Sequence, residues 1–278
     1  MSVTIGEALR GAGIDAREAR LLLAAAARLP EARVAAHPEQ PLEASDRERF
    51  EDWAARRRRG EPVAYLTGWR EFYGLKLAVT PAVLIPRHES ELLVERALAA
   101  LPARHTGRVL DLGSGSGALA LAIKHARPAA RVVGVEASAA ALAVARGNAA
   151  RLGLDLEWRC GEWFAAVPGG RFDLIVSNPP YVAQGDPHLG EGDLRFEPQA
   201  ALVGGADGLD AIRLIARAAS AHLAPGGWIF LEHGFDQAEA VRACLSAAEL
   251  QAVETWRDLA GHPRVSGGCA GRPADAGR

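Results

Sequence analysis

From residue 108 to residue 256, short apolar runs alternate with longer segments in which apolar residues repeat at helical spacing. Such alternation predicts an α/β fold, in which a mostly parallel sheet is covered by helices on both faces. Ligands of these sheets bind at the carboxyl ends of the strands, near the point where the strand order reverses. The predicted strands are 108–112, 131–136, 156–160, 172–177, 228–232 and 251–256. One predicted helix lies between the first two strands and ends near 127, and three others span 138–152, 209–223 and 237–248.

The first seventy residues carry helix-start patterns, in which a polar N-cap residue is followed three positions later by a glutamate. We therefore expect a small helical bundle over 1–70, a β-hairpin connector over 71–87 and the α/β domain over 88–266. A tail over 267–278, rich in Gly, Ala and Arg, is expected to fray. The N-cap pairs are Thr4 with Glu7, Asp15 with Glu18, and Ser45 with Glu48, and the helix stops are Gly13, Pro30 and Gly60.

The composition limits the compartment and the binding partners. Of 278 residues, 49% are hydrophobic and 24% are charged, which is typical of a globular protein. A net charge of −2 argues against nucleic-acid binding through bulk phosphate neutralisation. The longest apolar run, 21–27, is too short to cross a bilayer, the three cysteines form no C-x-x-C pair, and the histidines lack zinc-ligand spacing. We expect a cytoplasmic monomer without a metal, a membrane or a direct nucleic-acid partner.

A glycine-rich turn follows the first predicted strand and leads into a helix. Alternating glycines let a ligand approach the backbone and its N–H groups closely. Glu136, at the end of the next strand, stands where the ribose of a nucleotide cofactor would be held. The turn alone leaves open a nicotinamide cofactor, another nucleoside cofactor, or a structural turn without a ligand. Its residues are Gly113, Ser114, Gly115, Ser116 and Gly117.

The strand 172–177 ends in the corner Asn178-Pro179-Pro180-Tyr181. Two prolines fix φ and remove two N–H donors, so the backbone carbonyls of Asn178 and Pro179 point outward in a stiff turn. The Asn178 side-chain oxygen and the Pro179 carbonyl can accept the two hydrogens of an NH2 group, while Tyr181 covers its plane. The corner therefore predicts a site for a planar NH2 group, with Asn178, Pro179 and Tyr181 as catalytic residues.

This corner resembles the N/D-P-P-Y/F motif of class I S-adenosylmethionine-dependent methyltransferases that modify planar nitrogens, which favours S-adenosyl-L-methionine over a nicotinamide cofactor. Nearly the whole chain resembles the bacterial peptide chain release factor N5-glutamine methyltransferase family. It departs from that family at His88, where a proline is usual, at Glu136, where Asp is commoner, and at 264–268, which lack a clear final strand. The similar segments are 60–68, 71–74, 84–91, 162–164, 195–198, 201–202, 204–205 and 231–234.

The resemblance implies a doubly wound, seven-stranded, Rossmann-like sheet and methylation of the side-chain nitrogen of the glutamine in the Gly-Gly-Gln loop of class-1 peptide chain release factors. The turn 113–117 and Glu136 would hold the methionine and ribose ends of the cofactor, and Trp163 would lie by the adenine. Residues Asn178 to Tyr181, Pro180 included, would bind the glutamine amide, with Asn178 also contacting the cofactor. The helical domain is expected to dock the substrate.

Three other functions remain open at this stage. A ribosomal-protein glutamine methyltransferase would bind the same amide. An adenine-N6 DNA methyltransferase shares the corner motif, but the near-neutral charge and the short helical segment argue against it. A non-catalytic binding module would not need an intact Gly113, Gly115, Glu136 and Asn178.

Three further features carry expectations. Residues 182–205 lack helical or strand periodicity, and a loop of this length is usually functional, so we expect a lid that orders on substrate docking. The basic run 56–59 is expected to be a solvated helix end, with a docking patch as the alternative. Arg87 and Glu91 either line the cofactor pocket or form a surface ion pair.

Overall fold

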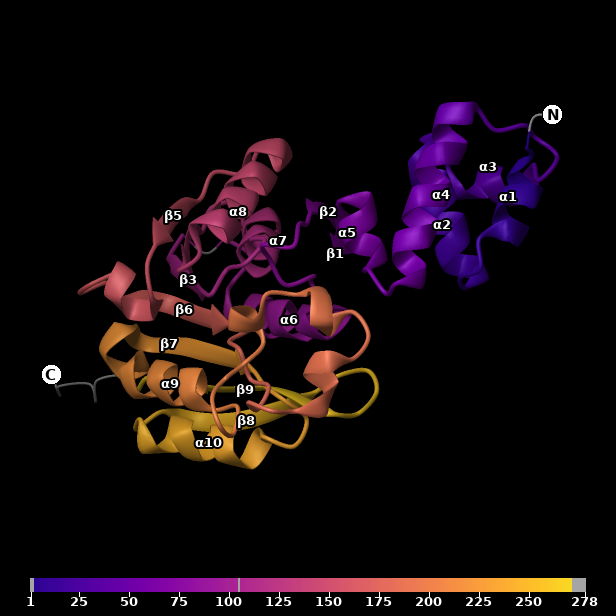
Figure 1. Cartoon of the computed structure of the whole chain (residues 1–278). Coiled ribbons are helices and arrows are strands. Elements are labelled where there is room, and N and C mark those ends of the chain that lie inside the picture. Colours follow the sequence, from indigo (N-terminus) through magenta and orange to yellow (C-terminus); the bar gives the residue numbers. More distant parts are fainter. Residues whose placement is uncertain (1–2, 105, 272–278) are drawn as a thin grey trace, which may run out of the picture. The chain divides into compact units, whose positions relative to one another are not determined.

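The computed structural model describes residues 3–104 and 106–271, and the chain forms two compact units. One unit comprises the chain up to Trp69 together with Gly190–Phe196. The other comprises Arg70–Leu189 and the chain from Glu197 onwards. Figure 1 labels most of the helices and strands of both units. No helix in the described residues combines the length and the apolar character needed to cross a bilayer.

The first unit is helical and is built around one apolar core. Its largest fully buried side chains come from three of the helices, which therefore bury one face each. The helices are α1 (Ile5–Gly11), α2 (Ala16–Ala27), α3 (Glu31–Ala36), α4 (Ala44–Arg58) and α5 (Val63–Thr67). The core side chains include Ile5, Leu22, Leu23 and Phe50.

Two of the three predicted helix starts are confirmed. Thr4 caps α1 in a reciprocal capping box, and the Asp15 carboxylate accepts hydrogen bonds from two backbone N–H groups at the start of α2. The start predicted at Ser45 is wrong, because α4 already begins at Ala44. Glu43 has the extended backbone of an N-cap residue, so Ser45 falls inside the first turn, where its hydroxyl cannot cap the helix.

The loop segment of the first unit, Gly190–Phe196, is joined to α4 by charged contacts. The guanidinium of Arg57 donates to Glu18 at 2.8 Å and to Asp193 at 3.0 Å. Arg195 donates to the backbone carbonyl that follows α4 at 2.6 Å. The expectation of a merely solvated helix end over 56–59 is therefore wrong for Arg57, whose charge is used inside the protein.

The predicted connector forms a two-stranded sheet of β1 (Trp69–Phe72) and β2 (Leu75–Ala78). The two strands are joined through Tyr73 and Gly74, whose φ angles of 50° and 74° are both positive. Positive φ at both central residues characterises the type I′ turn, which matches the twist of the strands that it connects. A β-hairpin is thus confirmed, but it spans 69–78, and the rest of the predicted connector, 79–87, contains no strand.

The second unit contains the predicted sheet of seven strands, in the order β5-β4-β3-β6-β7-β9-β8. Strands β3 to β7 run parallel, whereas β9 pairs antiparallel with both β7 and β8. The doubly wound, mostly parallel sheet is confirmed. The strands are β3 (Arg108–Leu112), β4 (Arg131–Glu136), β5 (Glu157–Cys160), β6 (Phe172–Ser177), β7 (Leu223–Glu232), β8 (Gln251–Arg257) and β9 (Pro263–Cys269).

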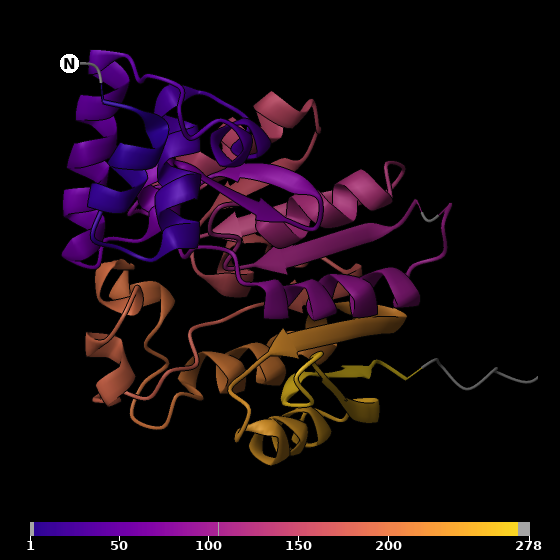
Figure 2. The same ribbon diagram turned by 90° about the vertical axis from the view of Figure 1, so that its right-hand side faces the viewer.

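Helices cover both faces of this sheet, as Figures 1 and 2 show. One apolar core lies between the sheet and α6, α7 and α8, and a second lies between the sheet and α9 and α10. These helices are α6 (Glu91–Ala100), α7 (Ala118–Ala126), α8 (Ala139–Leu152), α9 (Asp210–His222) and α10 (Ala238–Ala247). The 3-10 turns are η1 (His88–Ser90), η2 (Trp163–Ala166), η3 (Pro187–Gly190), η4 (Leu194–Phe196) and η5 (Gln199–Ala201).

The prediction of a fraying tail from residue 267 is wrong at its beginning, because 267–269 belong to β9. A Cβ atom on Gly267 would lie 2.4 Å from the Phe230 ring, so the glycine lets β9 approach that ring closely. The glycines that suggested a loop are therefore required by packing against β7. Residues 272–278 of the predicted tail lie outside the described residues.

Candidate active site

The glycine turn and the proline corner leave the sheet at the point where the strand order reverses. β3 lies between β4 and β6, so the turn after β3 and the corner after β6 start from adjacent strand ends. The hydroxyl of Ser177, the last residue of β6, donates to the carbonyl of Leu112, the last residue of β3, at 2.7 Å. This buried bond holds the two strand ends together. The site therefore lies where binding crevices of doubly wound sheets form.

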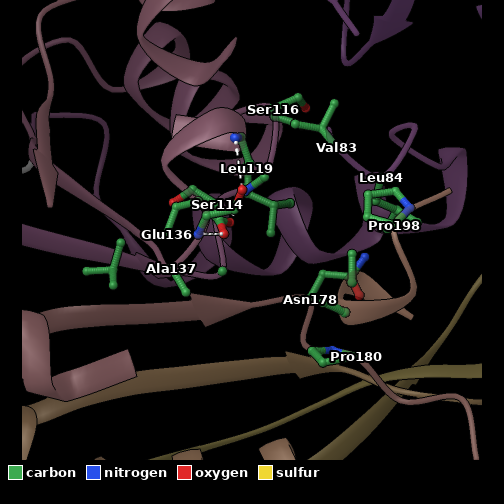
Figure 3. A pocket seen from close by; sticks show the side chains of 18 of the residues that line it. Val83, Leu84, Ser114, Ser116, Leu119, Glu136, Ala137, Asn178, Pro180 and Pro198 are labelled. Carbon is green, nitrogen blue, oxygen red and sulfur yellow. Dashed lines mark hydrogen bonds between the residues drawn. The ribbon is translucent and has the colours of Figure 1, made fainter. Parts of the chain in front are cut away.

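A cavity of about 410 Å³ opens at this edge of the sheet, within the size range of small-molecule sites. Its wall is formed by the glycine turn, the end of β4, the proline corner, the connector after β2 and the loop after the corner. Figure 3 shows Asn178 and Pro180 on one side of the hollow and Ser114 and Glu136 on another. The predicted site residues that line it are Gly113, Ser114, Gly115, Ser116, Glu136, Trp163, Asn178 and Pro180.

Glu136 is held at the cavity wall by two backbone donors. Its Oε2 atom accepts from the N–H of Gly115 at 2.8 Å, and its Oε1 atom accepts from the N–H of Ser138 at 2.9 Å. Gly115 adopts a φ of +54°, which glycine reaches without steric cost. The left-handed turn thus aims a backbone donor at the carboxylate. Each carboxylate oxygen keeps one further lone pair for a ligand hydroxyl.

Trp163 forms an aromatic wall beside the turn. A Cβ atom on Gly113 would lie 3.5 Å from the Trp163 ring, so the ring rests against the turn with no side chain between them. The adjacent Phe164 is buried in the core on the α9 face and anchors η2. A flat ligand ring can therefore stack against Trp163 beside the backbone of the turn.

Asp111, the residue of β3 that precedes Leu112, is fully buried. Its Oδ2 atom accepts from the N–H of Ala120 at 3.2 Å, whereas Oδ1 has no hydrogen-bond partner among the described residues. Burial raises the pKa of this carboxyl to about 7, with a smaller upward contribution from the charge of Glu136. Asp111 is therefore a buried acid behind the turn and does not line the cavity.

Asn178 is half-buried and points into the cavity from the end of β6 (Figure 3). Its Nδ2 atom donates to the Ser90 hydroxyl at 3.0 Å. Because Nδ2 is directed to Ser90, the side-chain oxygen Oδ1 is available as an acceptor for a ligand. The corner therefore presents a hydrogen-bond acceptor to the cavity, as the sequence predicted.

Three predicted site residues do not line the cavity. Pro179 is buried, although its carbonyl accepts no hydrogen bond from any described residue. A Cβ atom on Gly117 would lie 3.1 Å from Trp158, so this glycine serves close packing at the start of α7. Tyr181 packs instead against the core on the α9 face. The expectation that the Tyr181 ring covers a substrate amide does not agree with this placement.

The hydroxyl of Tyr181 donates to Oε1 of Glu232, at the end of β7, at 3.1 Å. Glu232 is fully buried, and burial raises its pKa to about 7. Hydrogen bonds from Ser90 and Tyr181 and the charge of Arg264 act in the opposite direction. Burial also raises the pKa of the Tyr181 hydroxyl above its usual range. Tyr181 therefore belongs to a buried polar cluster behind the corner.

Arg87 both lines the cavity and forms an ion pair. It donates to the carboxylate of Glu197 at 2.6 Å, and the Glu197 side chain is fully buried. Glu91 lies outside the cavity, where its carboxylate accepts from the N–H of Tyr73 at 3.1 Å. The loop 182–205 contains 3-10 turns without α-helix or strand, and the residues after Glu197 complete the cavity wall.

Several lining residues were not predicted, because they come from segments far away in the sequence. Ser90 and the connector residues carry no spacing that relates them to the corner. Only the family resemblance of segments 84–91 and 195–198 drew attention to these parts of the chain. The unpredicted lining residues include Val83, Leu84, Ser90, Pro198, Ala200 and Ala201.

The cavity combines backbone N–H groups in a glycine turn, a fixed carboxylate, an aromatic wall and an amide oxygen. Such a set suits a nucleoside with a polar tail, with the carboxylate for the ribose hydroxyls and the ring for the base. The amide oxygen of Asn178 then faces a second ligand with an N–H donor. Among the described residues, no cluster of three or more His, Cys, Asp or Glu side chains is placed to hold a metal ion.

Comparison with known proteins identifies the family. A family model described as PrmC N-terminal domain matches residues 4–68, and one described as Methyltransferase small domain matches residues 88–191. The release factor glutamine methyltransferase of Burkholderia pseudomallei is 52% identical over 272 residues, which cover 95% of each chain. That of Xylella fastidiosa is 54% identical over 237 residues, 84% of this chain and 86% of its own. The chain belongs to this family.

This membership confirms the resemblance to release factor glutamine methyltransferases that the sequence motifs indicated. A solved methyltransferase from Pyrococcus furiosus is 20% identical, with a TM-score of 0.56, over 80% of this chain and 100% of that chain. At this identity the likeness shows the fold alone. Relatives named for glutamine methylation match along nearly the full length, helical unit included.

Proposed function

We propose that this release factor glutamine methyltransferase transfers a methyl group from S-adenosyl-L-methionine to the side-chain nitrogen of the glutamine in the Gly-Gly-Gln loop of class-1 release factors. The observation that carries the proposal is the position of Asn178. Its side chain lines the same cavity as the glycine turn and Glu136, so a nitrogen bound there faces the cofactor position. The names of the similar relatives support the substrate.

The residues of the cavity fit the cofactor. Gly113 and Gly115 leave their positive-φ backbone open at the wall, and no atom lies within 4 Å of a Cβ atom placed on Gly115. Glu136 presents its fixed carboxylate to a ribose, and Trp163 offers a face to the adenine. When bound, S-adenosyl-L-methionine supplies a methyl group on a positively charged sulfonium.

The proline corner after β6 activates the amide nitrogen of the substrate. An amide nitrogen is poorly nucleophilic because its lone pair is delocalised into the carbonyl group. Asn178 Oδ1, which lines the cavity, accepts one N–H hydrogen. The Pro179 carbonyl lies outside the cavity wall but accepts from no described residue, and it is the acceptor that we propose for the second hydrogen. Acceptance of both hydrogens would localise electron density on the nitrogen and fix its direction. The nitrogen forms the new bond to the methyl carbon and then loses a proton to water. Catalysis therefore rests on positioning and on hydrogen bonding that strengthens as charge develops.

A labelling assay tests the proposal. Purified protein with methyl-tritiated cofactor is expected to label a class-1 release factor and to leave a factor with the acceptor Gln changed to Ala unlabelled. Asn178→Ala is expected to lower kcat at least about a hundredfold, as loss of a hydrogen bond to a developing charge does. Gln251→Ala, which removes an exposed amide on β8, is the matched control and is expected to keep full activity.

The outcome of this assay separates the alternatives. Label in a ribosomal protein or in DNA, with none in release factor, would refute the substrate assignment. Absence of cofactor binding in calorimetry would favour a non-catalytic module. The monomeric state, the cytoplasmic location, the substrate docking by the helical unit and the ordering of the lid stay predictions.

A further inference from the structure

Behind Asn178 lies a buried polar cluster of Ser90, Glu232 and Tyr181, from three segments far apart in the sequence. In the parallel pairing of β6 with β7, Ser177 stands opposite Leu231, so Asn178 and Glu232 are the next residues along adjacent strands. Ser90, in η1, is 5% exposed, and Glu232 is fully buried. Ser90 and Asn178 line the cavity, whereas Glu232 and Tyr181 do not.

The directions of the hydrogen bonds in this cluster follow from a count of hydrogens. The Ser90 hydroxyl accepts from Asn178 Nδ2 at 3.0 Å, so its own hydrogen must go to another acceptor. The carboxyl group of Glu232 is the acceptor nearby, since Asn178 and Glu232 follow paired residues of β6 and β7, and the Ser90 hydroxyl lowers the pKa of Glu232. Its Oε1 atom takes the Tyr181 hydroxyl hydrogen at 3.1 Å. Its Oε2 atom is buried without a hydrogen-bond partner among the described residues, which leaves an acceptor for the Ser90 hydrogen.

Above its pKa of about 7, Glu232 is an ionised carboxylate, which accepts and does not donate, so it then fixes the direction of every bond that leads to it. Ser90 donates toward Glu232, which leaves only the lone pairs of Ser90 for Asn178. The carboxamide of Asn178 must then place Nδ2 toward Ser90 and Oδ1 toward the cavity. The opposite rotamer would place an NH2 group in the cavity, where it would meet the N–H donors of a substrate amide.

We infer that Ser90 and Glu232 are positioning residues, which hold the Asn178 carboxamide in the orientation that accepts a hydrogen from the substrate amide. The inference rests on the proposed function and deepens it. Neither residue touches the reacting nitrogen, and each acts through Asn178. The corner motif is therefore incomplete without a serine hydroxyl from η1 and a buried carboxyl group from β7.

Kinetics of Ser90→Ala test the inference. Its kcat is expected to fall about ten- to hundredfold, as when a group that orients a reacting side chain is removed. The calorimetric Kd for S-adenosyl-L-methionine is expected to stay within about twofold, because other residues bind the cofactor. Ser90→Thr keeps the hydroxyl and is expected to restore kcat. Ser246→Ala, at an exposed site in α10, is the matched control.

Two further measurements separate positioning from structural support. Glu232→Gln keeps the shape of the side chain but can donate toward Ser90, so its kcat is expected to fall like that of Ser90→Ala while its Tm stays within a few degrees. In a double-mutant cycle, Ser90→Ala is expected to cause no further loss of labelling rate in an Asn178→Ala background.

Several results would overturn the inference. Wild-type kcat in Ser90→Ala, an equal loss of cofactor affinity, failure of Ser90→Thr to restore activity, or an additive loss in the double variant would each do so. Because wild-type protein labels release factor in the same assay, these outcomes differ from failure of the proposed function, in which wild-type protein gives no label.

Discussion

Asp111 makes the stability of this protein depend on pH in a way that one substitution can reveal. The carboxyl group is fully buried behind the glycine turn, and burial raises its pKa to about 7. In the unfolded chain an aspartate has a pKa of about 3.9. Between these two values the folded protein binds a proton that the unfolded chain has released. The contribution of this group to the free energy of unfolding therefore falls as the pH rises from about 4 to about 7, and it stays constant above about pH 7.

The size of the effect follows from the separation of the two pKa values. Each pH unit between them changes the free energy of unfolding by about 1.4 kcal/mol. From pH 5 to pH 8 this group alone is expected to lower the stability by on the order of 3 kcal/mol. Asp111→Asn removes the titration and keeps a side-chain oxygen for the N–H of Ala120. Urea unfolding of both proteins at pH 5, 6, 7 and 8 measures the difference.

The comparison of slopes removes effects that do not depend on pH. Asp111→Asn can change the stability at any single pH, but only loss of the titration flattens the pH profile relative to the wild type. Asp155→Asn, at an exposed site before β5, is the control and should leave the wild-type profile unchanged. Parallel profiles for wild type and Asp111→Asn would show that this carboxyl is ionised in the folded protein across the whole range, and the reasoning would fail.

Two further predictions concern packing and cofactor binding. Gly267→Ala places a Cβ atom 2.4 Å from the Phe230 ring and is expected to lower the stability to urea by about 1–3 kcal/mol. Gly147→Ala in α8, where no atom lies within 4 Å of the added Cβ, is expected to raise it by about 0.5–1 kcal/mol, and equal effects of the two would contradict the argument. Trp163→Ala is expected to raise the calorimetric Kd for S-adenosyl-L-methionine about tenfold or more through lost stacking, and an unchanged Kd would remove Trp163 from the cofactor site.

The sequence predicted most of the α/β unit because strand patterns are local. The run 172–177 coincides with β6, since an uninterrupted apolar stretch that ends at two prolines has few alternatives to a buried strand. The last strand, β9, was missed because its two glycines resemble a loop. Their function becomes visible only when the Phe230 ring lies against Gly267. The sequence of either strand alone does not show that the two strands approach each other closely.

The candidate site was predicted where it depends on strand ends and missed where it depends on register. Gly113 and Asn178 follow strands directly and Glu136 ends a strand, so the order of elements suffices to bring them to one edge. The environment of Tyr181 was wrongly predicted, because the nearness of Glu232 arises only from the pairing of β6 with β7. Ser90 was missed because its hydrogen bond to Asn178 joins residues 88 positions apart in the sequence.

The loop segment Gly190–Phe196 has a consequence for chimaeras of this protein with its relatives. It is encoded between β6 and α9, yet it belongs to the helical unit, where Asp193 pairs with Arg57. An exchange of the first 69 residues alone would bring in a foreign helix end without the acidic partner that evolved beside it. A functional transplant of the helical unit therefore needs two separate stretches of the gene, with the shorter one cut from the middle of the other unit.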